Sequence, residues 1–162
     1  MSGGSETLAA SASSARMARQ ATRDTAPEMA LRRALFMAGF RYRVDYQLPG
    51  IPRRRADIVF PKQRVAVFVD GCFWHRCPDH ATFPKTNAEW WRAKLARNWE
   101  RDRETDQLLI ANGWRVVRVW EHESLADALE AVRHSLEEPR EEPGRGVVGR
   151  PHEQRPVEQS VS

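Results

Sequence analysis

The stretch that most constrains the fold is residues 56–80, ADIVFPKQRVAVFVDGCFWHRCPDH. Two apolar runs within it, Ile58–Phe60 and Val65–Val69, are typical of β-strands. The second run is apolar on both faces, so we expect it to be a central strand of the sheet. A buried strand has no structural need for a carboxylate at its end, yet Asp57 opens the first run and Asp70 closes the second. These two acids predict a functional site at one end of the sheet.

A cluster of possible metal ligands follows directly. The spacing Cys72-x4-Cys77-x2-His80 suits zinc, which takes thiolate and imidazole ligands in a tetrahedron. The chain shows no secretory signal, so we expect a reducing cytoplasm, in which a disulfide is disfavoured. The fourth ligand stays open, although a histidine that directly follows a predicted strand is favoured: the candidates are His75, His122, His134 and His152. The alternative is two buried free cysteines with scattered surface histidines.

Three helices and further strands are expected around this stretch. Thr25 and Glu28 form a capping box with Pro27 in the first turn, which predicts a helix to about Ala38. From the capping pattern alone, Glu28 needs no role beyond capping the helix. Further elements follow in order: a strand at residues 42–46, a helix from the capping box at residues 86–89 to about residue 111, a strand at 114–120 and a helix at 125–136 capped by Ser124.

This order predicts one α/β domain at residues 25–137, with a small mixed β-sheet flanked by α-helices. Residues 1–24 are rich in Ser, Ala, Gly and Arg, and residues 138–162 are rich in Pro, Glu, Arg and Gly. Because neither segment has a periodic apolar pattern, we expect a disordered basic arm and a disordered tail. No apolar run is long enough to span a membrane.

The charge balance points to a polyanionic partner. Lys and Arg number 26 against 22 Asp and Glu, and such an excess is typical of nucleic-acid binding, although a solvated surface explains it equally. Lys94, Arg97 and Arg101 form one stripe of the predicted helix that can follow a phosphate backbone, with ordinary surface ion pairs as the alternative. The arginines at residues 53–55 are either a solvated turn or a phosphate grip. A tryptophan of the same helix, which has Trp at residues 90, 91 and 99, can stack on a base.

Several segments, taken together, resemble one known family. They are DxxPE at residues 24–28, ADIVF at 56–60, VAVFVDGCFWH at 65–75, KxxxNxxRD at 94–102 and GWRVVRVWEHE at 113–123. Over about residues 17–136 the chain is thus similar to the very short patch repair (Vsr) endonucleases. The resemblance implies a restriction-endonuclease-like fold with a structural zinc site. It also implies a Mg²⁺-dependent hydrolase that nicks duplex DNA 5′ of the thymine in T·G mismatches, which arise when 5-methylcytosine deaminates.

The resemblance also implies roles for single residues. Asp57 would hold Mg²⁺ together with the backbone carbonyl of Val69. His75 would be the general base for the attacking water, a task that neutral imidazole suits near pH 7. Glu28 matches an active-site glutamate, which overturns the capping-only interpretation. Asp70, at a position that is histidine in some members, would support catalysis.

Binding residues follow in the same way. The implied zinc ligands are Cys72, Cys77, His80 and His122, and the implied DNA contacts are Phe73, Trp74, Trp91, Lys94, Arg97 and Arg101. The aromatic side chains would wedge into the stack beside the mismatch. We expect a monomer in the bacterial cytoplasm at the nucleoid, acting on double-stranded DNA with a mismatch-repair matchmaker (MutL-type) protein as a further partner. The alternatives are a sequence-specific restriction-type nuclease of the same fold and a non-catalytic, zinc-stabilised DNA-binding module.

Overall fold

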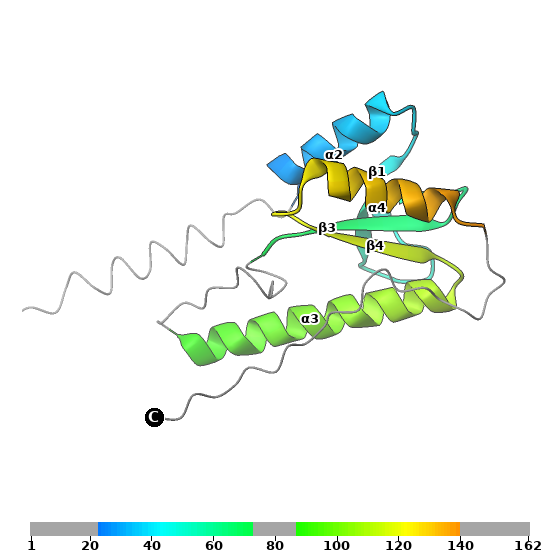
Figure 1. Cartoon of the computed structure of the whole chain (residues 1–162). Coiled ribbons are helices and arrows are strands. Elements are labelled where there is room, and N and C mark those ends of the chain that lie inside the picture. Colours follow the sequence, from blue (N-terminus) through cyan, green and yellow to red (C-terminus); the bar gives the residue numbers. More distant parts are fainter. Residues whose placement is uncertain (1–22, 73–86, 140–162) are drawn as a thin grey trace, which may run out of the picture.

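The computed structural model describes residues 23–72 and 87–139, in which helices cover both faces of a four-stranded sheet (Figure 1). The strand order is β1-β2-β3-β4, with β1–β2 and β2–β3 antiparallel and β3–β4 parallel. The strands are β1 (Arg43–Gln47), β2 (Arg55–Phe60), β3 (Val65–Asp70) and β4 (Arg115–Trp120). This confirms the predicted mixed α/β architecture, which fits a restriction-endonuclease-like fold.

Strand β3 is central, as its continuous apolar sequence predicts, because both of its faces are covered (Figure 1). Helices α2 (Ala26–Met37) and α4 (Leu125–Glu137) lie on one face, and α3 (Ala88–Ala111) lies on the other. The parallel pairing of β3 with β4 needs such a crossover helix between the two strands. The core on the α2 and α4 side includes Leu31, Leu35, Ile58, Phe60, Val65, Val67, Val117, Val119 and Val132. The core on the α3 side includes Leu48, Ile51, Val59, Ala66, Phe68, Leu109 and Val116.

Local signals set the helix ends. The Thr25 hydroxyl accepts the Glu28 N–H at 3.5 Å, and Ser124 accepts the Asp127 N–H at 3.1 Å, so both predicted N-caps are confirmed. Helix α3 begins only at Ala88, after Asn87, whose φ is 56° and whose side chain makes no capping hydrogen bond. The start of α3 thus falls within the predicted capping box at residues 86–89, whose first residue, Thr86, lies outside the described residues.

The topology brings several chain ends to one edge of the sheet. Because β2 is antiparallel and β4 is parallel to β3, the start of β2 lies beside the ends of β3 and β4. The Glu121 N–H donates to the Asp70 carbonyl at 3.0 Å and ties the last two ends together. The first turn of α2 reaches the same edge. In the described part of the chain, no helix is long and apolar enough to cross a membrane.

Candidate active site

Asp57 bridges the two strands at this edge. The β2–β3 pairing begins at Ile58↔Val67, and just beyond it Asp57 Oδ2 accepts the Val69 N–H at 2.8 Å. The pKa of Asp57 is raised from its usual 3.8 to about 6. Burial is the main cause, and the charges of Glu28 and Asp70 act in the same direction, against the Val69 hydrogen bond and Arg32. Three carboxylates from α2, β2 and β3 therefore influence one another at one place.

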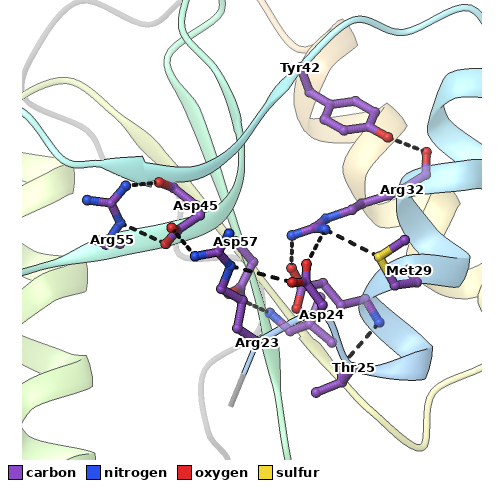
Figure 2. Close-up of polar contacts among 11 residues, drawn as sticks. Arg23, Asp24, Thr25, Met29, Arg32, Tyr42, Asp45, Arg55 and Asp57 are labelled. Atoms are coloured by element: carbon purple, nitrogen blue, oxygen red, sulfur yellow. Dashed lines mark hydrogen bonds and ion pairs between the residues drawn. The ribbon is translucent and has the colours of Figure 1, made fainter. Parts of the chain in front are cut away.

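Glu28 turns its carboxylate into this site. Its side chain is 2% exposed and accepts a hydrogen bond from Arg32, one helical turn later in α2. Arg32 also donates to Asp24 at 2.6 Å, while its own carbonyl accepts the Tyr42 hydroxyl at 2.6 Å (Figure 2). The Glu28 backbone serves the cap at Thr25, whereas its carboxylate serves the interior. The capping-only interpretation is therefore too narrow.

A second group of ion pairs borders the site (Figure 2). Asp45 of β1 accepts hydrogen bonds from Arg23 and from Arg55, each at 2.7 Å, and the Arg55 bond lowers the Asp45 pKa. Arg54 pairs with Glu104 of α3 at 2.9 Å. Arg54 and Arg55 are thus paired with carboxylates of the protein, which favours a structural role for them over a phosphate grip.

Asp70 lies at the end of β3 and is bound from β4. Arg118 Nη1 lies 2.9 Å from each of its carboxylate oxygens. The same guanidinium donates through Nε and Nη2 to Asp106 of α3, at 2.9 and 2.8 Å. Asp70, Arg118 and Asp106 form an ion triad that joins β3, β4 and α3. Through Asp70, the triad adjoins the carboxylates of Asp57 and Glu28.

The part of the predicted zinc site that is described lies next to Asp70. Cys72 Sγ is 3.1 Å from His122 Nδ1, and the Cys72 N–H donates to Glu121 at 2.8 Å. Ligands of one tetrahedral zinc lie roughly 3.5 Å apart when they are sulfur and nitrogen. These two side chains therefore fit a shared zinc. The remaining predicted ligands, Cys77 and His80, lie outside the described residues.

Helix α3 carries the predicted DNA contacts. The Trp91 ring is 4% exposed whereas the Trp90 ring is 52% exposed, and the two are 4.8 Å apart in a T-shaped pair. Lys94 Nζ lies 4.8 Å from the Trp90 ring and 5.4 Å from the Trp91 ring. Arg97 and Arg101 are exposed, as a surface for phosphates requires. The predicted residues Phe73, Trp74 and His75 lie outside the described residues.

The sequence analysis assigns no role to four charged residues of this region. Arg32 had a signal, because it is four residues after Glu28 and can pair with it on a helix. Arg118 also had one, as a charge inside the apolar run WRVVRVW. Asp24 is the first residue of the DxxPE segment, but that segment gives it no role of its own. Asp106 had no signal, since an acid in a polar helix is ordinary.

Residues 23–72 and 87–139 do not by themselves gather three His, Cys, Asp or Glu side chains into a metal site. A zinc tetrahedron here needs Cys77 and His80 in addition. A Mg²⁺ ion at Asp57 needs oxygen ligands that are not side chains, such as a backbone carbonyl, water or phosphate. The donor types present fit both ions.

The chain is similar to several known DNA endonucleases. A family model described as "DNA mismatch endonuclease Vsr" matches residues 5–80. "Type II nicking enzyme V.NaeI" of Lentzea aerocolonigenes is 56% identical over 115 residues, 69% of each chain. "DNA mismatch endonuclease Vsr" of Escherichia coli is 41% identical over 128 residues, 73% of this chain and 76% of its own length. "Type II nicking enzyme V.XorIIP" of Xanthomonas oryzae is 40% identical over 125 residues, 73% of this chain and 86% of its own length.

The relatives and the site together define the class of protein, which is a hydrolytic nuclease that acts on DNA. Within that class, the chain belongs to the Vsr family of endonucleases, as its sequence resemblance predicts.

The raised pKa of Asp57 has a consequence for stability. Because the folded state binds the Asp57 proton more tightly than the unfolded state does, the free energy of unfolding falls as the pH rises from 3.8 to about 6. The total decrease is at most about 3 kcal/mol. We expect Asp57→Asn to stabilise the metal-free protein at pH 7 by about 1–3 kcal/mol and to have little effect at pH 4. Urea unfolding of both proteins in EDTA at the two pH values measures this. An equal effect at both values would contradict it.

Proposed function

We propose that this endonuclease nicks duplex DNA 5′ of the thymine in T·G mismatches left by deaminated 5-methylcytosine, in a Mg²⁺-dependent reaction of very short patch repair. The observation that carries the proposal is the buried Asp57 carboxylate, held at the strand ends beside Glu28, in a chain that is 41% identical to the Escherichia coli "DNA mismatch endonuclease Vsr". A buried carboxylate with neighbours of the same charge favours a bound cation.

Asp57 and the Val69 carbonyl would hold Mg²⁺ through hard oxygen ligands. When bound, the ion supplies the positive charge that a phosphodiester needs to accept a nucleophile. The imidazole of His75 takes the proton from the attacking water. Glu28, oriented by Arg32, completes the negative site. Asp70 supports the reaction from the end of β3, where Arg118 engages both of its carboxylate oxygens.

Aromatic side chains would open the DNA at the mismatch. Phe73, Trp74 and Trp91 insert beside the mispaired bases, and unstacking costs least at a mismatch. Since Trp91 is 4% exposed, its insertion requires it to leave its present packing. Lys94, Arg97 and Arg101 contact the phosphates.

A structural zinc held by Cys72, Cys77, His80 and His122 would brace the loop that carries Phe73 to His75. The 3.1 Å approach of Cys72 and His122 supports this assignment. We further propose that the enzyme domain spans residues 25–137 and acts as a monomer in the nucleoid, with a MutL-type matchmaker as partner. Most of the predicted arm and tail, residues 1–22 and 140–162, lies outside the described residues.

A second candidate function is suggested by two relatives that are named type II nicking enzymes. On that alternative, a specific sequence alone would be cut, without a mismatch.

Duplexes that differ only in T·G against T·A at one position separate the two functions. We expect nicking of the T·G duplex to be at least about 100-fold faster, because unstacking a mismatch saves a few kcal/mol, and the nick to fall 5′ of the mispaired thymine. End-labelled strands and single-turnover kinetics in Mg²⁺ measure rate and position together. Equal rates on the two duplexes would support the sequence-specific alternative.

A further inference from the structure

We propose that Arg118 is a positioning residue of the nicking reaction, because it fixes the end of β3 against helix α3 and thereby sets the place of Asp70 and Val69. The inference rests on the endonuclease activity of the family and does not depend on the specificity for T·G. Nothing in the family resemblance or the comparisons assigns a role to Arg118.

The contacts of Arg118 use both edges of its guanidinium. Nη1 is 2.9 Å from both oxygens of Asp70, while Nε and Nη2 donate to Asp106 at 2.9 and 2.8 Å. Nη2 also approaches the Asp102 carbonyl at 3.4 Å, and the guanidinium lies 4.6 Å from the Phe68 ring. One side chain of β4 therefore holds a residue of β3 and two residues of α3. Only the planar fork of arginine can donate in two directions in this way.

The Arg118 contacts are largely shielded from water, so the loss of one partner has a large effect. The Arg118 and Asp70 side chains are 22% and 7% exposed. Burial alone would lower the pKa of Arg118, but the charge of Asp70 and the hydrogen bond to Asp106 raise it, so the guanidinium stays charged. Removing one partner of such a group leaves an uncompensated charge away from water, and the chain must rearrange to solvate it.

The rearrangement would reach the proposed metal ligands. Asp70 is bonded directly to Val69, whose N–H holds the Asp57 carboxylate at 2.8 Å. The Asp70 carbonyl also accepts the Glu121 N–H, beside the Cys72 and His122 pair. A shift of Asp70 therefore moves the strand end that carries the catalytic groups. Asp70 itself acts through Arg118, which engages both of its oxygens, and its contribution is to hold the strand end.

Asp106 connects Arg118 to the helix that carries the proposed phosphate contacts. It lies on α3, the helix that presents Arg97 and Arg101 to solvent. Through Asp106, Arg118 sets the distance between this helix and the end of β3. On this proposal, one partly buried guanidinium holds bound DNA and the cutting site in register.

The test is single-turnover nicking of any duplex that the wild-type enzyme cuts, with DNA affinity measured separately in EDTA. We expect Arg118→Met to lower the nicking rate about 10- to 100-fold, as displacement of a reactive group by about 1 Å does, with affinity changed less than about threefold. Arg118→Lys keeps the charge but lacks the fork, so we expect a rate closer to that of Arg118→Met than to wild type. Arg133→Met is the matched control, because Arg133 also pairs with a carboxylate but on the exposed face of α4.

A second variant protects the test against loss of folding. In the double variant Arg118→Met with Asp70→Asn, the charge of Asp70 that faces the missing guanidinium is also removed, and thermal unfolding should show a folded protein. We expect its nicking rate to stay as low as that of Arg118→Met. A folded variant of either kind that nicks at the wild-type rate would overturn the proposal, as would a loss of DNA affinity as large as the loss of rate. Failure of the wild type to prefer T·G would refute the proposed specificity and leave this result intact.

Discussion

Asp57→Asn is expected to lower the single-turnover nicking rate by at least about 1,000-fold while duplex binding stays within about threefold of wild type. The amide oxygen can still accept the Val69 N–H, so the strand ends keep their 2.8 Å bridge. What is lost is the negative charge that we propose holds the divalent cation, and with it several kcal/mol of transition-state stabilisation. Rates are measured on a T·G duplex in Mg²⁺, and binding is measured in EDTA.

The matched control is Asp45→Asn on the neighbouring strand β1. It removes the same charge close by, from a carboxylate that pairs with Arg23 and Arg55 and is not among the charges that shift the Asp57 pKa. We expect its nicking rate to stay within about threefold of wild type, since surface ion pairs contribute little. If Asp57→Asn nicked as fast as this control, the protein would not use Asp57 for catalysis, and the proposed place of the cation at Asp57 would be wrong.

Cys72→Ser is expected to remove zinc and to lower the midpoint of thermal unfolding by more than about 10 °C. The purified wild-type chain should hold about one zinc, and binding of a structural zinc contributes directly to folding. A loss of about 5 kcal/mol corresponds to a shift of this size in a chain of 162 residues. Metal analysis and thermal unfolding, before and after chelation, measure both effects.

Histidine variants test whether His122 is a zinc ligand. We expect His122→Ala to behave like Cys72→Ser, because His122 Nδ1 is 3.1 Å from Cys72 Sγ. His134→Ala is the control, since His134 lies on the exposed face of α4 and pairs with Glu138 at 3.1 Å. A zinc-free wild-type chain that is stable and active would remove the zinc assignment altogether.

The sequence predicts the parts of this fold that depend on local pattern. The apolar run of β3 predicts its central place, because only a strand covered on both faces tolerates apolar residues at every position. Thr25 and Ser124 predict the starts of α2 and α4, since a short polar side chain before a helix satisfies its first amides. Asp57 and Asp70 are conspicuous because they are charges at the ends of buried strands.

Contacts between distant elements are what the sequence does not predict. Arg118 is 48 residues from Asp70 and 12 from Asp106, so their meeting depends on the crossover through α3 and on strand register. The resemblance names Trp91 as a DNA contact, but only the packing shows that Trp91 is buried and Trp90 exposed. Helical spacing cannot separate two adjacent tryptophans at the edge of an apolar face.

The most direct test of the central claim is the nicking rate on a T·G duplex as a function of Mg²⁺ concentration, for wild type and for Asp57→Asn. We expect wild type to show saturable activation by Mg²⁺ with a single nick 5′ of the mispaired thymine, and Asp57→Asn to show no activation at any concentration. Nicking by wild type that persists unchanged in EDTA, or full Mg²⁺ activation of Asp57→Asn, would contradict a cation held by Asp57 at the cutting site.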